Sequence, residues 1–341
     1  MREERVLCVI LERDAASDEI DMIRKEENKS ASEGLYTGRV LAGYGKSYPV
    51  KYRGRVYQCA LRGKFRLMED WTSNPVAVGD RVRFRIIDEM NGVIEEIQPR
   101  RNRISRPTKE GRIKERIIVA NVDQIFVVVS VKEPVLKAGV IDLMLLAAER
   151  ERVRGVICIN KIDLDEAGIA GAAAEMYTKL RYTVILVSAK TGAGMDALEK
   201  VVAGKFSVFI GQSGVGKSSL INRLVPGLNQ RVQEISKYCG KGKHTTAFVI
   251  AVPYGSGLIA DTPGFKDFGL WGINKRNLRE FFREFRRYDY QCKFQPCFHI
   301  SEPRCAVKDA YQAGKMAPSR YENYVRIFEA LERERRLEYG D

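Results

Sequence analysis

Between residues 35 and 106 the chain consists of short stretches in which apolar and polar positions alternate. This period of two predicts strands, of which the clearest lie at residues 36–41, 55–61, 81–87 and 92–97. Glycine, asparagine and proline mark the turns between them. About five strands in roughly 70 residues are typical of a small barrel of the oligonucleotide-binding (OB) type. We therefore predict an OB-type β-barrel over residues 35–106, and we assign no structure to residues 1–34.

A different pattern follows, in which continuous apolar runs alternate with helical spacing. The runs lie at residues 125–129, 155–159, 183–187, 206–210 and 258–260. Strands that are apolar on both faces are typical of a parallel sheet covered by helices on both sides. Between two of these runs, Ile141, Leu145 and Ala148 fall on one face of a helix. The alternation predicts a doubly wound parallel α/β domain over residues 107–272, joined to the barrel by a basic linker at residues 100–107.

From about residue 273 the spacing becomes that of amphipathic helices. Leu278, Phe281, Phe282 and Phe285 follow the i, i+3, i+4, i+7 rule, and a second stripe covers residues 321–331. We expect both stripes to face a core. They predict a third domain, mostly helical, over residues 273–341.

Composition adds a strong positive charge to these three domains. The formal net charge of the 341 residues is +14, which favours a polyanionic partner such as nucleic acid, although a basic enzyme without one is the plainer reading. Aromatic rings lie among the cations of the predicted barrel and suit base stacking, but barrel core is the simpler explanation for any single ring. These rings belong to Tyr36, Tyr44, Tyr48, Tyr52, Tyr57 and Phe65.

The apolar runs are short throughout the chain. None reaches the roughly 18 residues that suggest a membrane span. The apolar stretch at residues 6–10 is too short for the core of a signal peptide. We expect a cytoplasmic monomer that binds no membrane.

A phosphate-binding loop is the first of four motifs for a nucleotide. Gly211-x4-Gly216-Lys217-Ser218 follows a predicted strand and opens a predicted helix, which is the context that such a loop requires. Its backbone N–H groups would wrap the phosphates, Lys217 would reach the β- and γ-phosphates, and Ser218 would ligate Mg²⁺. A chance Gly-rich turn is the alternative. The loop residues assigned to the nucleotide are Gly211, Gln212, Ser213, Gly214, Val215, Gly216, Lys217, Ser218 and Ser219.

Two further motifs predict selection of guanine. In Asn160-Lys161-Ile162-Asp163, the carboxylate of Asp163 can accept both N1–H and the 2-amino group of guanine, which adenine lacks. Asn160 would bond the purine edge, and the stem of Lys161 would lie over the ring. In Ser188-Ala189-Lys190, the Ala189 N–H would bond the guanine carbonyl. Asn-Lys-x-Asp alone can occur by chance, but four motifs that each end a strand are specific.

The fourth motif, Asp261-Thr262-Pro263-Gly264, ends the strand at residues 258–260. Asp261 would hold the Mg²⁺ shell, and the Gly264 N–H would bond the γ-phosphate. Residues 240–246 take the place of the first switch, and Thr246, with Thr245 as the alternative, should contact Mg²⁺ and the γ-phosphate. Phe265 occupies the position where many GTPases use Gln to orient water, and a Phe cannot do so. We therefore predict His244 as the water-positioning group, the alternative being a surface histidine in a basic loop.

A cluster of cysteines and one histidine predicts a metal site. Seven cysteines are too few for a disulfide scaffold, yet Cys292-x4-Cys297-x-His299-x5-Cys305 offers three thiolates and one imidazole close together. Such a set suits tetrahedral Zn²⁺ with no open position, hence a structural site. Unliganded cysteines are the alternative. Catalytic zinc is disfavoured because four ligands leave no place for water.

The order of the motifs is inverted, since the guanine motifs precede the phosphate loop. Together these residues resemble the circularly permuted GTPases of the ribosome small subunit-dependent GTPase A family (RsgA, also YjeQ), over roughly residues 35–330. The resemblance implies an OB barrel, a permuted GTPase domain and a zinc domain. It also implies hydrolysis of GTP to GDP and phosphate, stimulated by the small ribosomal subunit and its rRNA and coupled to late subunit maturation and release of the factor. The family's proposed catalytic histidine matches His244.

Two other functions stay open at this point. One is a nucleotide-gated RNA-binding protein whose hydrolysis is incidental. The other is a metabolic P-loop kinase or ATPase, which Asp163 disfavours because its carboxylate would be left unpaired by adenine.

Overall fold

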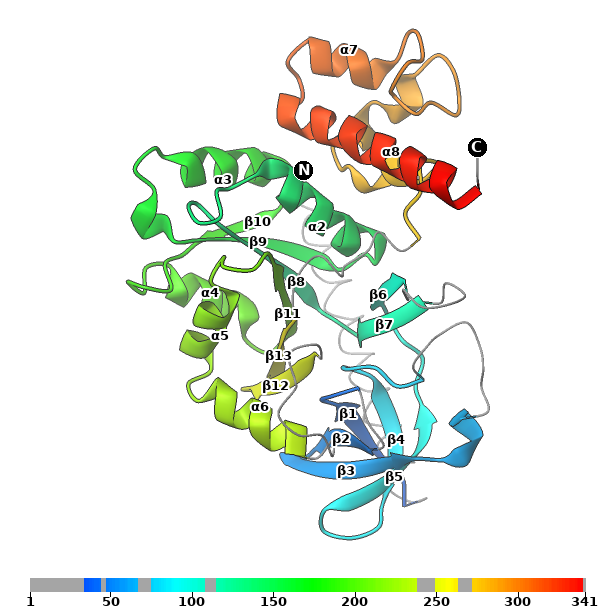
Figure 1. The fold of residues 1–341 in the computed structure, drawn as a ribbon, viewed down its shortest axis with the longest axis vertical. Coiled ribbons are helices and arrows are strands. Elements are labelled where there is room, and N and C mark those ends of the chain that lie inside the picture. Colours follow the sequence, from blue (N-terminus) through cyan, green and yellow to red (C-terminus); the bar gives the residue numbers. More distant parts are fainter. Residues whose placement is uncertain are drawn as a thin grey trace, which may run out of the picture.

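The structure is a computed structural model that describes residues 34–43, 47–66, 75–107, 115–237, 249–262 and 272–339. A β-barrel, an α/β domain and a helical region follow one another along the chain, and the α/β domain lies between the other two (Figure 1). This arrangement confirms the predicted fold class. Residues 1–33 lie outside the described part, and the predicted domain limits stay predictions.

The barrel is closed, with the strand order β1-β2-β3-β5-β4. Strands β3 and β5 pair in parallel and the other neighbours pair antiparallel. Four of the strands lie within a residue of the predicted ranges. The fifth strand, β2, is not among the predicted ranges. It contains Pro49, and a proline within a run argues against a strand because it has no N–H for pairing. The strands are β1 (Tyr36–Val40), β2 (Ser47–Tyr52), β3 (Arg55–Leu61), β4 (Arg81–Ile86) and β5 (Asn91–Ile97), and a 3₁₀ turn η1 (Gly63–Arg66) follows β3.

Aromatic side chains of the barrel pack mainly into its core. Tyr48 and Tyr57 are buried, and Phe84 is at the centre of a group that includes Tyr36 and Tyr52. The ring centroids of Tyr36, Tyr52 and Tyr57 lie 6.2, 5.9 and 5.5 Å from that of Phe84. For these four tyrosines the structure favours barrel core over base stacking. Tyr44 lies outside the described residues.

The α/β domain has one six-stranded sheet in the order β10-β9-β8-β11-β13-β12. Its strands are parallel except β12, which pairs antiparallel with β13. Helices α2 and α3 cover one face and α4 and α5 the other (Figure 1). The elements are β8 (Gln124–Ser130), α2 (Ala138–Arg150), β9 (Arg154–Asn160), η2 (Ile162–Leu164), α3 (Ile169–Lys179), β10 (Thr183–Leu186), α4 (Met195–Val202), β11 (Phe206–Gly211), α5 (Lys217–Leu224), α6 (Leu228–Lys237), β12 (Ile250–Tyr254) and β13 (Gly257–Asp261).

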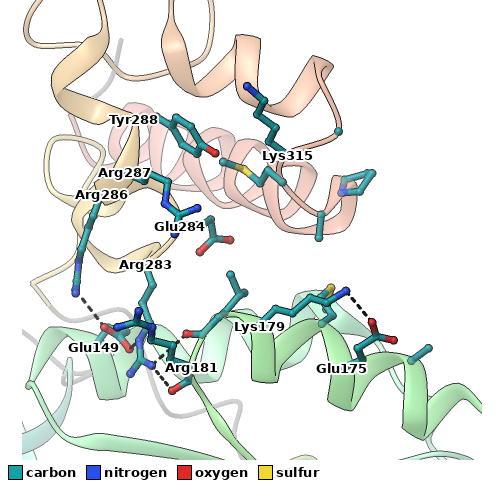
Figure 2. Close-up of a pocket in the computed structure, with 17 residues that line it drawn as sticks. Glu149, Glu175, Lys179, Arg181, Arg283, Glu284, Arg286, Arg287, Tyr288 and Lys315 are labelled. Atoms are coloured by element: carbon teal, nitrogen blue, oxygen red, sulfur yellow. Dashed lines mark hydrogen bonds and ion pairs between the residues drawn. The ribbon is translucent and has the colours of Figure 1, made fainter. Parts of the chain in front are cut away.

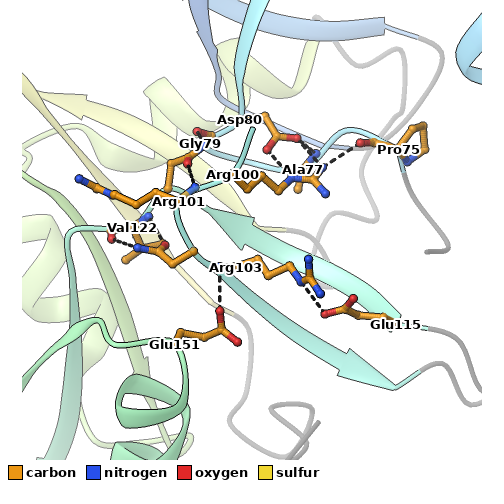
Figure 3. A network of polar contacts seen from close by, with 12 residues as sticks. Pro75, Ala77, Gly79, Asp80, Arg100, Arg101, Arg103, Glu115, Val122 and Glu151 are labelled. Atoms are coloured by element: carbon orange, nitrogen blue, oxygen red, sulfur yellow. Dashed lines mark hydrogen bonds and ion pairs between the residues drawn. The ribbon is translucent and has the colours of Figure 1, made fainter. Parts of the chain in front are cut away.

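The predicted basic linker is wrong, because residues 100–107 are built into the structure. Arg103–Pro107 forms strand β6, which pairs antiparallel with β7 (Glu115–Ala120). Arg100 binds both oxygens of the buried Asp80 at 2.7 Å, and Arg103 Nε lies 2.9 Å from Glu115 Oε1 (Figure 3). The carboxylates that pair with these arginines lie elsewhere in the sequence. The composition of residues 100–107 taken alone is therefore typical of a solvated linker.

Gly79 holds the barrel against the α/β domain. Its φ is +86°, and a Cβ there would lie 2.2 Å from Ala120 O and 2.4 Å from a ring carbon of Phe206. Gly54 also has a left-handed φ, of +81°, but a Cβ there would meet nothing within 4 Å. A substitution at Gly54 therefore tests backbone strain alone, whereas a substitution at Gly79 adds a steric clash between the barrel and the α/β domain.

We expect Gly79→Ala to loosen the barrel from the α/β domain, whereas Gly54→Ala costs only left-handed strain of about 1 kcal/mol. Thermal unfolding should show a loss of several degrees for Gly79→Ala. Hydrogen exchange should quicken at the Ala120 amide, which donates to Val78 O at 2.8 Å. Equal effects of the two substitutions would contradict this packing role.

Over residues 272–339 the structure describes two α-helices and three 3₁₀ turns. The elements are η4 (Leu278–Phe281), η5 (Phe285–Arg287), η6 (Asp289–Gln291), α7 (Ala306–Gln312) and α8 (Pro318–Tyr339). The prediction of a continuous helix over residues 278–285 is wrong, because the backbone of Phe282 is extended, with φ −98° and ψ 102°. The stripe is still buried, since Leu278, Phe282 and Phe285 have no exposed surface. Successive 3₁₀ turns therefore place the same side chains inward.

Candidate functional site

Three of the nucleotide motifs meet at the carboxyl end of the parallel strands, with Asn160 between them. Asn160, at the end of β9, is 1% exposed. Its Nδ2 donates to Val215 O in the phosphate loop at 2.9 Å, and its Oδ1 accepts from the Ala189 N–H at 3.0 Å. One amide group thus fixes the distance between the loop for phosphates and the loop for the base.

The side chain of Asp163 is oriented by the neighbouring motif. Ser188 Oγ donates to Asp163 Oδ1 at 2.5 Å and accepts from the Thr191 N–H at 3.1 Å. The serine therefore restrains the carboxylate that would read guanine. Lys161, which has a left-handed φ of 62°, donates from Nζ to Glu133 O. Sequence reasoning missed this carbonyl, because only the fold brings residues 131–137 to the pocket.

The phosphate loop has the backbone that its glycines allow. Gly216 has φ +89°, and a Cβ there would lie 2.3 Å from Asn160 Nδ2. Lys217 Nζ donates to Gly211 O at 2.9 Å and to Gln212 O at 3.2 Å, so its ammonium lies inside the loop. Burial lowers the pKa of Lys217, and Asp261 partly opposes the shift. An anion in the loop would favour the charged ammonium.

Ser218 and Asp261 form a pair of oxygen donors beside Lys217. Ser218 Oγ donates to Asp261 Oδ2 at 3.2 Å, while the buried Asp261 Oδ1 has no hydrogen-bond partner within the described residues. Burial raises the pKa of Asp261, and Lys217 opposes this shift. A hydroxyl and a desolvated carboxylate with an unused oxygen fit the ligand preference of Mg²⁺. The predicted Thr245, Thr246, His244 and Gly264 lie outside the described residues.

The cysteine cluster is assembled in the C-terminal region. Cys292, Cys297, His299 and Cys305 are all buried, and one ligand atom from each lies within 4.8 Å of the others. His299 Nδ1 faces the cluster, 3.3 Å from Cys305 Sγ and 3.6 Å from Cys292 Sγ. Four such atoms could hold one metal ion.

Charge in the cluster also fits a bound cation. Burial raises the pKa of Cys297 to about 12 and also raises the pKa of Cys305, so these thiols hold their protons unless a cation replaces them. Burial lowers the pKa of His299 and keeps its imidazole neutral, the form that ligates metals. His299 Nε2 lies 3.1 Å from Asp289 Oδ1, a carboxylate that would orient the ring and that sequence reasoning missed.

The metal predicted from the sequence is zinc, and we expect Cys297→Ser to reduce the metal content of the purified protein well below one ion per chain, because a hydroxyl is a much weaker zinc ligand than a thiolate. The matched control is Cys59→Ser in the barrel, whose thiol has a pKa that burial raises to about 12 and which is remote from the cluster. Mass spectrometry of the metal content after dialysis measures both. Full zinc retention by Cys297→Ser would contradict the assignment.

Comparison with known proteins identifies the family. The family model for the RsgA GTPase matches residues 97–271, and that for the RsgA N-terminal domain matches residues 37–94. The chain belongs to the RsgA GTPase family. The "Small ribosomal subunit biogenesis GTPase RsgA" of Christiangramia forsetii is 37% identical over 303 residues, covering 86% of this chain and 96% of that protein. The protein of the same name from Moorella thermoacetica is 39% identical over 301 residues, covering 87% and 98%.

Two solved structures share the fold of this RsgA family member. YjeQ from Thermotoga maritima superposes with a TM-score of 0.71 and 36% identity, covering 87% of this chain and 98% of that one. YloQ, described as a circularly permuted GTPase, superposes with a TM-score of 0.68 and 30% identity, covering 88% and 96%. The predicted family and the permuted order of the motifs are confirmed. Across the described ranges, no helix is both long and apolar enough to cross a membrane.

Proposed function

We propose that this protein is a GTPase that acts in biogenesis of the small ribosomal subunit. The observation that carries the proposal is the position of Asn160, which joins a phosphate loop to two guanine motifs in a chain of the RsgA family. The relatives named above supply the ribosomal part. The protein would bind GTP and GDP, contact the small subunit and its rRNA, and work as a cytoplasmic monomer.

Each motif has a distinct part in the proposed reaction. Asp163 accepts the guanine N–H groups, and the Ala189 N–H binds the guanine carbonyl. Lys217 neutralises the β- and γ-phosphates, while Ser218, Asp261 and Thr246 hold Mg²⁺. When bound, Mg²⁺ would offset the phosphate charge that develops during hydrolysis. Gly264 would bond the γ-phosphate, and His244 would orient the attacking water. Zn²⁺ on the cysteine cluster would be structural.

Contacts between the domains support coupling of the nucleotide state to RNA binding. The Ala251 N–H in β12 donates to Leu41 O in the barrel at 2.8 Å. In sequence, β12 follows the segment that carries His244, Thr245 and Thr246. A change in that segment on loss of the γ-phosphate would therefore reach the barrel through a direct backbone contact, and could release the factor from the subunit.

Steady-state GTP turnover with purified ribosomal subunits tests this function. Small subunits should accelerate turnover, large subunits should not, and Lys217→Ala should abolish the stimulated rate. Stimulation should weaken steeply as salt rises, because association with RNA is dominated by phosphate contacts. Equal stimulation by both subunits, or by neither, would contradict the ribosomal role.

We expect His244→Ala to lower subunit-stimulated hydrolysis by about 100-fold or more, the usual contribution of a group that positions or activates a nucleophile. The affinity for a non-hydrolysable GTP analogue should stay unchanged, because the histidine contacts water rather than nucleotide in this mechanism. Single-turnover kinetics and calorimetry separate the two quantities. An unchanged stimulated rate would assign water positioning to another group.

The alternative function, in which hydrolysis is incidental, is not favoured by membership of a GTPase family.

A further inference from the structure

A cleft of about 1140 Å³ lies between the α/β domain and the C-terminal region, apart from the nucleotide pocket, the cysteine cluster and the barrel. One wall is the carboxyl end of α3 and the residues after it, and the other is formed by residues 283–288 and 314–318 (Figure 2). The volume exceeds the range of about 300–1,000 Å³ that is typical of small-molecule pockets. The cleft therefore suits an extended ligand.

All three carboxylates that line the cleft are already neutralised by cations. Glu149 accepts from Arg283 Nε at 2.6 Å and from Arg286 Nη2 at 3.3 Å. Glu284 accepts from Arg320 at 2.6 and 3.0 Å. Glu175 pairs with Lys179 Nζ at 2.7 Å. The acidic side chains therefore leave little negative charge to repel an anionic ligand.

Three cations in the same lining have no such partner. Arg181, Arg287 and Lys315 are exposed, and their side chains form no hydrogen bond or ion pair with any residue that the structure describes. In Figure 2, Arg287 and Lys315 lie on the C-terminal side of the cleft, and Arg181 lies on the side of α3. The cleft thus presents unpaired positive charge from both walls.

Backbone charge acts in the same direction. The carbonyls of Leu180 and Arg181, at the negative end of α3, accept from Arg283 Nη1 at 3.4 and 2.9 Å. On the opposite wall, helix α8 begins at Pro318, so its positive amino end borders the cleft. Arg283 thus neutralises the negative end of α3, and the amino end of α8 adds positive potential to the cleft.

We propose that this cleft binds the phosphate backbone of a single-stranded RNA segment. Arginine guanidinium groups form paired hydrogen bonds with phosphate oxygens, and a flexible strand can enter a space between two domains. Tyr288 on one wall offers a ring on which a base can stack. The choice of RNA among polyanions rests on the function proposed above, whereas the choice of an anion rests on the cleft alone.

The test is fluorescence anisotropy of a labelled twelve-nucleotide RNA with the full-length protein across a salt series. The cleft variant is Arg181→Gln/Arg287→Gln/Lys315→Gln. The matched control, Arg152→Gln/Lys200→Gln/Arg326→Gln, removes the same charge at exposed positions outside the cleft. The cleft variant should bind RNA at least tenfold more weakly near 0.1 M salt, and the magnitude of its slope of log K against log salt should fall by about 2, as expected for three lost contacts. The control should change far less.

Hydrogen exchange locates the binding. RNA should protect residues 176–182 and 314–318 in the wild type and in the control, but not in the cleft variant. Equal RNA affinity of the two variants would overturn the proposal, as would tighter binding of an acidic peptide than of RNA at these segments. Both variants should keep wild-type GTP affinity. Failure of the ribosomal function would appear separately, as wild-type turnover that small subunits do not stimulate.

Discussion

Asp163→Asn should weaken GTP binding by about 100-fold or more and should create a preference for xanthosine triphosphate. The carboxylate accepts two guanine N–H groups, and hydrogen bonds to a charged group contribute about 1.5–3 kcal/mol each. An asparagine amide at the same place can accept a hydrogen bond from only one of these N–H groups. Its NH₂ is itself a donor and faces the other N–H without forming a hydrogen bond. Xanthine carries an oxygen where guanine carries the 2-amino group, so it can accept from that NH₂.

Asp165→Asn is the matched control for this substitution. Asp165 lies in the same loop, but its oxygens accept from the N–H groups of Ile169 and Ala170 at 2.9 Å and cap α3. Asparagine keeps only one of these two acceptor oxygens, so the control should lose some stability but should keep the guanine preference. Isothermal calorimetry with GTP, ATP and xanthosine triphosphate compares the two variants with the wild type. Unchanged discrimination in Asp163→Asn would refute the assignment of the guanine site.

The nucleotide motifs could be found from sequence because their chemistry is local. Lys217 and its glycines lie within a few residues, and so do Asn160 and Asp163. The contacts that join the motifs are not local: Asn160 reaches Val215 across 55 positions, and Lys161 reaches Glu133 across 28. Pattern analysis predicts that each motif ends a strand, and the parallel sheet then places the strand ends together.

The errors of the sequence analysis also have physical causes. Spacing alone cannot distinguish an α-helix from successive 3₁₀ turns, and the extended backbone at Phe282 is what separates the two here. Composition made Arg100 resemble a linker residue, because its partner Asp80 lies twenty positions away. The cleft could not be predicted for a related reason. Its charge depends on which arginines are paired, and Arg283 and Arg286 pair with Glu149 of another domain.

One buried arginine determines how the C-terminal region is held on the α/β domain. Arg320 in α8 is 2% exposed, and it donates to Asp142 of α2 at 2.5 Å and to both oxygens of Glu284. Asp142 also accepts from Tyr177 at 2.7 Å and from Asn323 at 2.6 Å. Burial alone would lower the pKa of Arg320, but Asp142 and Glu284 together outweigh it and raise that pKa, so the guanidinium stays charged.

Arg320→Leu should destabilise the docked C-terminal region by about 3–5 kcal/mol, the usual cost of removing one partner from a buried ion pair. The remaining carboxylates would be buried without a cation. Arg326→Leu on the exposed face of the same helix is the matched control and should change stability by less than about 0.5 kcal/mol. Hydrogen exchange in α2 and α8 is the suitable measurement, because a multidomain chain need not unfold in two states.

The defect of Arg320→Leu should depend on pH in a direction that tests its cause. Burial raises the pKa of Asp142 and Arg320 opposes the shift, so removing the arginine leaves a folded-state pKa above the unfolded value of about 4. Below pH 4 the carboxyl is protonated in both states and costs little, and the penalty grows as pH rises toward the folded-state pKa. The variant should therefore be closer to wild type at pH 5 than at pH 8.

Adding Asp142→Asn and Glu284→Gln should remove this difference between the two pH values. A defect that is the same at both pH values and persists in the triple variant would mean that Arg320 acts by packing against Phe282 rather than by its charge.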